Sequence, residues 1–143
     1  MIKVQADEMM TYLEEVFPQV RGEFAIDRLD DDLLIMRLKV QERHLRPGGT
    51  ISGPAMFGLA DVAAYVATMA RIGKEALAVT TNCSIDFMRK PRAGGDLLVH
   101  ARVLKLGRVL SVIDCLLYSE GTDAPVARAS LTYSIPPGAA QAG

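Results

Sequence analysis

Apolar and polar residues alternate with a period of two along six segments of the chain, and such alternation predicts β-strands. The clearest case is residues 33–41, where Leu34, Met36 and Leu38 fall on one face and Arg37 falls on the other. Short turn segments connect the first two strands and the last four, so we predict antiparallel strands. The predicted strands are residues 23–29, 33–41, 77–88, 96–106, 109–119 and 125–134.

Two segments have helical spacing instead. In residues 7–17, Met10, Leu13 and Phe17 recur on one face and acidic residues occupy the first turn, so we predict a short amphipathic helix that the following proline ends. Residues 53–70 are apolar on almost every side and predict a longer helix that is buried all round.

The order of these elements predicts the fold class. A helix and two strands precede the long apolar helix, a loop at residues 42–52 leads into that helix, and four strands follow it. Since one central helix must cover the antiparallel sheet, we predict an α+β fold in which the sheet wraps around it. No repeat or linker divides the 143 residues, so we predict a single domain over 1–143, with residues 135–143 as a flexible tail.

Composition and charge narrow the class of protein. Half of the residues are hydrophobic and 23% are charged, which is typical of a globular protein. The net charge of −1 argues against nucleic acid as a partner. Residues 1–10 lack the features of a secretory signal, so we expect a cytoplasmic protein. Residues 53–70 are at the short limit of a membrane span and contain an Asp, two Gly and a Pro, so we interpret them as a core helix and expect no membrane partner.

Cysteine and histidine residues point to no metal or disulfide chemistry. Cys83 and Cys115 lie in predicted strands and are predicted to be small buried hydrophobes. There is no CxxC pair, and His44 and His100 are in different segments, so we predict no metal site. The sequence also lacks the Ser elbow of serine hydrolases and a glycine-rich phosphate loop.

Asp61 is the only charged residue in the long apolar helix. Burying a carboxylate without a partner is costly, and no Lys or Arg lies within helical reach on that segment. The helix begins at Ser52-Gly53-Pro54, and its free backbone N–H groups could polarise a carbonyl that a carboxylate two turns inside could attack. A purely structural alternative stays open, with Ser52 as an N-cap and Asp61 as a hydrogen-bonded core carboxylate.

Residues 44–54, HLRPGGTISGP, followed by Leu59-Ala60-Asp61, resemble the signature of the PaaI-type acyl-CoA thioesterases of the hotdog fold. In that family an Asn is followed six residues later by His-Gly-Gly, and nine residues after the His comes an Asp within Leu-Ala-Asp. Here the spacing is kept, but Arg46, Ser52 and Pro54 replace the Asn, the His and the second Gly. The resemblance extends from the first strand to the last and includes the basic segment FMRKPRAGGDLLVHARVLKLGR.

The resemblance implies hydrolysis of an acyl-CoA thioester by a homodimer or a dimer-of-dimers tetramer, with no cofactor other than the CoA of the substrate. In the family, the Asp of one subunit faces the helix N-terminus of another. Asp61 would then be the general base or the nucleophile, the Gly53 N–H would bind the thioester carbonyl, and Ser52 would hold the catalytic His position. Thr80 would supply a hydroxyl that holds the water, although period two places it on one strand face with Asn82, Ser84 and Asp86.

Further residues are predicted to bind the substrate. Phe57 and Tyr65 share the helix face of Asp61 and are predicted to line the acyl pocket, where Tyr65 could add a hydroxyl. Basic residues near the predicted turns are predicted to form a rim for the polyanionic CoA, although each of them is also compatible with an ordinary exposed charge. They are Arg46, Arg89, Lys90, Arg92, Lys105 and Arg108.

Two other functions fit the same fold. The loss of the family His and second Gly would suit a non-catalytic protein that binds acyl-CoA or lipid. An acyl-thioester dehydratase is less favoured, because one pattern of such enzymes has a His five residues after the Asp, and here that position is Val66.

Overall fold

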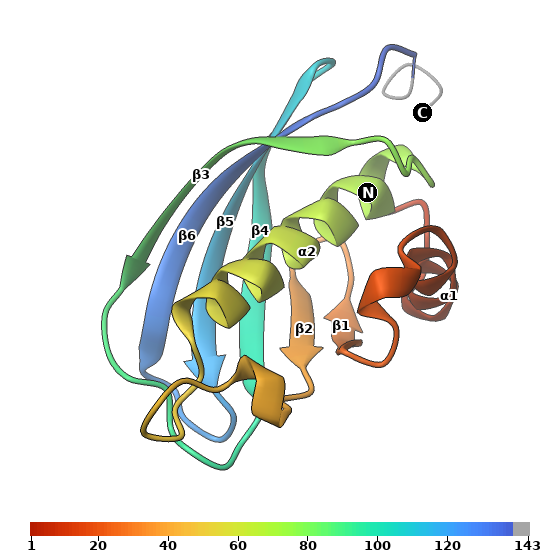
Figure 1. Cartoon of the computed structure of the whole chain (residues 1–143). Helices are drawn as coiled ribbons and strands as arrows, with labels where there is room; N and C mark the ends of the chain where they lie inside the picture. Colours follow the sequence, from red (N-terminus) through yellow and green to blue (C-terminus); the bar gives the residue numbers. More distant parts are fainter. Residues whose placement is uncertain (139–143) are drawn as a thin grey trace.

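Residues 1–138 are described by the computed structural model, in which a curved antiparallel sheet holds one long helix on its concave side (Figure 1). The helices are α1 (Ala6–Val16) and α2 (Gly53–Ile72). The strands are β1 (Phe24–Leu29), β2 (Leu34–Leu38), β3 (Val79–Phe87), β4 (Leu97–Leu106), β5 (Leu110–Ser119) and β6 (Pro125–Ser134). The strand order β1-β2-β4-β5-β6-β3 confirms the predicted α+β class with a sheet around a central helix.

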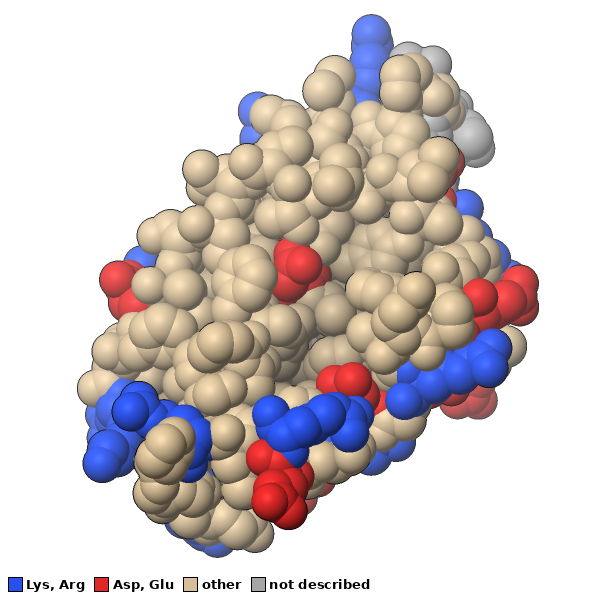
Figure 2. Space-filling view, viewed as in Figure 1, with Lys and Arg blue, Asp and Glu red and all other residues tan. Residues whose placement is uncertain are grey.

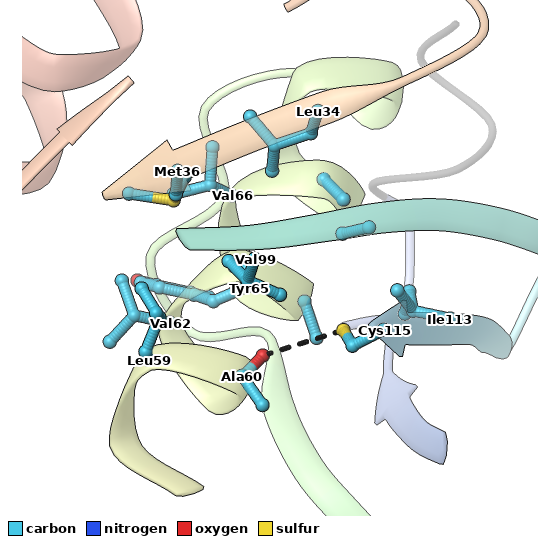
Figure 3. Close-up of a cluster of buried hydrophobic side chains, with 14 of the residues drawn as sticks. Leu34, Met36, Leu59, Ala60, Val62, Tyr65, Val66, Val99, Ile113 and Cys115 are labelled. Carbon is cyan, nitrogen blue, oxygen red and sulfur yellow. Dashed lines mark hydrogen bonds between the residues drawn. The ribbon is translucent and has the colours of Figure 1, made fainter. Parts of the chain in front are cut away.

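The core lies between α2 and the sheet. Leu59 and Val66 of α2 are fully buried against Met36 of β2 and Val99 of β4, and Figure 3 shows these side chains converging. Much of α2 is alanine, and these small side chains let the helix approach the strands closely. Although α2 is long and apolar enough to cross a membrane, 72% of its most apolar window is buried inside the fold. This burial matches the interpretation of a core helix.

Helix α1 packs beside β1, where its two fully buried side chains are Met9 and Leu13. The sequence pattern pointed to Met10, Leu13 and Phe17, but Met10 and Phe17 are only partly buried against the core. Met9 and Leu13 are four residues apart and thus share one helix face, which is the one turned to the core.

Strand β3 pairs with β6, not with β4, which follows it in sequence. The segment between β3 and β4 is therefore a crossover, and the prediction that a short turn joins two neighbouring strands is wrong at this point. Strand β3 is an edge strand, and within residues 1–138 no strand pairs with its other side.

A β-bulge interrupts β3 near its start. Thr80 pairs with Tyr133, the next pair is Asn82 with Thr132, and Thr81 has no partner. An extra residue in one strand changes the alternation of faces. Thr80 therefore points toward α2, and the prediction that it shares a face with Asn82 and Ser84 is wrong.

The residue that follows β6 is still bonded to the sheet. Ile135 is buried, and its N–H donates to the Val109 carbonyl at 2.7 Å. Residues 139–143 of the predicted flexible tail lie outside the described residues.

Candidate active site

Asp61 lies in the middle of α2, half-buried, and is held by two hydroxyl groups from the sheet. Its Oδ1 atom accepts hydrogen bonds from Thr80 Oγ1 at 2.5 Å and from the Tyr133 hydroxyl at 2.9 Å. In the described part of the chain no Lys, Arg or His forms an ion pair with this carboxylate. Neutral hydroxyl donors, and not a cation, therefore compensate the charge.

Tyr133 holds its position in the sheet because its ring is 4% exposed and stacks on Tyr65, with the ring centroids 5.9 Å apart. Burial, together with the nearby charge of Asp61, raises the pKa of Tyr133, so its hydroxyl stays protonated and can donate. The Tyr65 hydroxyl instead donates to the Ala76 carbonyl at 2.7 Å. Tyr65 therefore contributes its ring to this region, while its hydroxyl fixes the segment that precedes β3.

Sequence reasoning missed Tyr133. It occupies an apolar position in the alternating pattern of the last strand, where an aromatic residue predicts core packing. It is 72 residues from Asp61 in sequence, and only the pairing of β3 with β6 brings the two together.

The N-terminus of α2 presents one free donor. Ser52 is the N-cap, and its Oγ accepts from the Ala55 N–H at 3.2 Å. The Ser52 carbonyl accepts from the Met56 N–H, and Pro54 has no N–H. Among residues 1–138 no acceptor is found for the Gly53 N–H, so it is the first-turn donor that a ligand can use.

Glycine at position 53 allows an aromatic side chain to lie close to this N-terminus. A Cβ atom added there would lie 3.3 Å from the ring of Phe87, which is 53% exposed on the edge strand. The aromatic ring therefore covers Gly53 closely, at the end of β3 that is far from Thr80.

A pocket of about 530 Å³ opens beside this helix N-terminus. Its apolar walls include Met56, Phe87 and Met88, and three basic residues line it as well. They are Arg46, Arg89 and Lys90. The fold thus brings three of the predicted basic residues close to the Gly53 N–H, the predicted donor to a substrate carbonyl. This environment suits a ligand with a polyanionic part and an apolar part.

The basic residues that were predicted to form one rim lie near the two opposite ends of β3. Lys105 and Arg108 lie at the β4–β5 turn, beside the start of β3, because Val79 and Leu110 both pair with Ser134. Figure 2 shows Lys and Arg gathered at the edges of this face, with a largely uncharged surface between them. Arg92 is exposed next to the pocket, and its N–H donates to Ser119 Oγ at 2.8 Å.

The Asp61 carboxylate and the Gly53 N–H are far apart within one chain. Asp61 follows Gly53 by eight positions in α2, which is about 12 Å along a helix axis. Phe57, which is 39% exposed, lies between them in sequence and is accessible to a ligand. A single carbonyl group cannot contact the Gly53 N–H and the Asp61 carboxylate of the same chain.

His44 has a structural role outside these groups. It is buried, its Nδ1 accepts from the Gln41 N–H, and its Nε2 lies 3.1 Å from Oε1 of Glu23. The His44 carbonyl accepts from the Ser52 N–H at 2.8 Å, so this contact supports the loop that leads into α2. In the part of the chain that the structure describes, no three His, Cys, Asp or Glu side chains are placed to hold a metal ion.

Comparison with known proteins gives consistent matches. A family model described as the thioesterase superfamily matches residues 48–126. The structure of a candidate thioesterase from Silicibacter sp. TM1040 is 63% identical, has a TM-score of 0.90, and is matched over 96% of this chain and 95% of that chain. Human acyl-coenzyme A thioesterase 13 is 28% identical, over 78% of this chain and 79% of its own length. A mutant of the phenylacetic acid degradation protein PaaI from Thermus thermophilus is 25% identical, with a TM-score of 0.69, over 82% of this chain and 97% of that chain.

Proposed function

The chain belongs to the thioesterase superfamily, and from this membership we propose that it hydrolyses an acyl-CoA thioester to a free acid and CoA. Membership confirms the hotdog fold and the resemblance to PaaI-type enzymes that residues 44–61 indicate. The observation that carries the proposal is the Asp61 carboxylate, which is half-buried, has no cationic partner among residues 1–138, and is held by the Thr80 and Tyr133 hydroxyls. The similarity of the chain to human acyl-coenzyme A thioesterase 13 supports an acyl-CoA as the class of substrate.

In the proposed reaction, Asp61 activates water as a general base or attacks the carbonyl carbon itself. On the general-base route, the water oxygen bonds to the thioester carbon as Asp61 takes a proton. The C–S bond then breaks, and the CoA sulfur leaves with a proton returned from Asp61. The reaction requires only water and the substrate, so the proposal includes no other cofactor.

The developing oxyanion is assigned to the Gly53 N–H and the positive end of the α2 dipole. Ser52 acts as the cap, since its hydroxyl satisfies the Ala55 N–H and leaves Gly53 free. The CoA part of the substrate fits the pocket beside this donor, where Arg46, Arg89 and Lys90 provide positive charge.

The separation of Asp61 from Gly53 in one chain leads to a homodimer with composite sites. If two copies of β3 pair antiparallel about a two-fold axis at Ser84, Cys83 lies opposite Ile85 of the second copy, and the extra residue of the bulge brings Thr80 opposite Phe87. Thr80 binds Asp61, and Phe87 covers Gly53, so this pairing would bring the carboxylate of one copy to the helix N-terminus of the other.

The surface of β3 supports this pairing. Its outer edge has no strand partner among residues 1–138, and apolar side chains at both ends are exposed, with Val79 at 57% and Met88 at 48%. The same pairing would bring Lys105 and Arg108 of one copy toward the basic pocket of the other. A dimer of such dimers would form the alternative tetramer.

The test is release of CoA thiol from a panel of short-chain, medium-chain and aromatic acyl-CoAs by wild type and Asp61→Asn. We expect wild type to hydrolyse at least one substrate and the variant to lose about 10²-fold or more in kcat, the usual contribution of a general base. Acyl-CoA binding without hydrolysis by either protein would contradict the proposal and favour a non-catalytic binding protein. Equal hydrolysis by wild type and Asp61→Asn would show that Asp61 has no catalytic role.

A further inference from the structure

We propose that Tyr133 is a positioning residue that holds Asp61 in its reactive orientation and leaves one carboxylate oxygen free for the reaction. The inference rests on the proposed thioesterase function. It starts from an unusual contact, because the Tyr133 hydroxyl lies 2.9 Å both from Oδ1 of Asp61 and from the main-chain carbonyl oxygen of Asp61. One hydroxyl thus bridges the side chain of the carboxylate to its own backbone, which restricts rotation of the side chain.

Tyr133 is better placed than Thr80 to fix this orientation. Thr80 lies next to a bulge on the edge strand β3, whereas Tyr133 is on β6, which has β5 on one side and β3 on the other. The Tyr133 ring is almost fully buried and stacks on Tyr65, whose own hydroxyl is bonded to the Ala76 carbonyl. The sheet and helix core therefore set the position of this hydroxyl.

Both hydroxyls bind the same oxygen. Thr80 and Tyr133 donate to Oδ1 of Asp61, and within residues 1–138 the Oδ2 atom has no hydrogen-bond partner. A carboxylate held in this way presents Oδ2 to water or to the carbonyl carbon, and cannot rotate to exchange its two oxygens without breaking both bonds. Tyr133 does not touch the reacting atoms; it acts through Asp61.

Tyr133→Phe removes the hydroxyl and keeps the stacked ring. Steady-state hydrolysis should show kcat lower by about ten- to a hundredfold, the effect of one hydrogen bond to a charged group, with KM within about twofold. Tyr118→Phe is the matched control, since Tyr118 packs on His100 away from Asp61, and it should keep the wild-type kcat. A wild-type kcat in Tyr133→Phe would overturn the inference.

A double-mutant cycle separates positioning from general stability. In the Asp61→Asn background, Tyr133→Phe should cause no further loss of the residual kcat, because the group that it positions is gone. A further loss as large as in wild type would overturn the inference and indicate a structural role. A wild type that hydrolyses no acyl-CoA would overturn the proposed function and this inference together, whereas an active wild type with a fully active Tyr133→Phe would overturn only the inference.

A measurement on the intact chain covers the case in which Tyr133→Phe does not fold. NMR of protein labelled with ¹³C at the tyrosine Cζ atoms reports on the Tyr133 hydroxyl bond. We expect the Tyr133 resonance to shift in Asp61→Asn and the Tyr118 resonance to stay unchanged. An unchanged Tyr133 resonance would overturn the inference, because the hydroxyl would not be bonded to the carboxylate.

Discussion

At the scale of single residues, the site shows how a carboxylate is kept in an apolar helix without a cation. The charge of Asp61 is compensated by the hydroxyls of Thr80 and Tyr133, which come from two adjacent strands. A bidentate arginine would occupy both carboxylate oxygens, and any ion pair would hold a counter-charge in the site, whereas two hydroxyls on Oδ1 leave Oδ2 available. This arrangement suits a base or nucleophile better than a purely structural acid.

Gly53→Pro tests the oxyanion donor at the same scale. Both Gly53→Pro and its control Gly53→Ala add a Cβ atom near Phe87, but only the proline removes the N–H. We expect Gly53→Pro to lower kcat by about 10²–10³-fold with little change in KM, the loss typical of one oxyanion donor. Steady-state kinetics of the two variants provide the measurement, and equal kcat values would rule out the role assigned to the N–H.

At the scale of elements, two local features place groups of the site. The bulge at Thr81 turns Thr80 from the outer face of β3 to the helix side. The loop between β2 and α2 is held by His44, which joins Glu23 of the segment before β1 to the cap of α2. The bulge lies near the start of β3 and positions Thr80 beside Asp61, and the loop leads directly to Gly53 at the start of α2.

The loop contact predicts a pH dependence of stability. Burial raises the pKa of Glu23, but hydrogen bonds from His44 and Arg43 outweigh it and hold the pKa below its ordinary value of 4.5. Between the folded and unfolded pKa values the unfolded chain binds more protons, so the free energy of unfolding rises with pH in that window. We expect this contribution to be complete above pH 4.5 and to be lost as the pH falls through the folded pKa.

Urea unfolding between pH 3 and 6 measures this dependence, in wild type and in Glu23→Gln. The variant should lose this part of the pH dependence, while Glu15→Gln, an exposed change on α1, should keep it. An unchanged slope in Glu23→Gln would show that the loop contact does not contribute to the dependence.

At the scale of the whole molecule, the proposed site is complete only in a pair of chains. One chain places Asp61 and Gly53 too far apart for one carbonyl and divides the basic residues between two ends. The proposed antiparallel pairing of β3 would bring Asp61 of one chain close to Gly53 of the other, and would bring the two groups of basic residues together. That a single symmetric contact would do so is the strongest structural argument for a dimer.

Mixing two impaired variants tests this composite site. Asp61→Asn and Gly53→Pro homodimers should each keep about 1% of the wild-type activity or less, but a heterodimer would combine the intact carboxylate of one chain with the intact donor of the other. After subunit exchange at equal amounts, about a quarter of the wild-type activity should return, because about half of the dimers carry one intact site of two. Thiol release before and after mixing is the measurement. Activity that does not rise in confirmed heterodimers would contradict the composite site.

Local sequence patterns were enough to predict the element types, the central helix and the residues that stand out within it. Periodicity is local, so alternation over ten residues predicts a strand and the apolar run of residues 53–70 predicts a buried helix. Asp61 and Gly53 are also visible locally, the first as an uncompensated charge and the second as the start of a helix. The family motif adds only the expected roles of these positions.

The distant residues that meet Asp61 and Gly53 could be identified only from the packing of the strands. Pairing of β3 with β6 instead of β4, and the bulge that reverses the face of Thr80, depend on contacts between strands that no local pattern specifies. They bring Tyr133 to Asp61 across 72 positions and divide the basic residues between the two ends of β3. Strand order is set by the packing of the whole sheet on α2, and for that reason the partner of the carboxylate could not be found in the sequence.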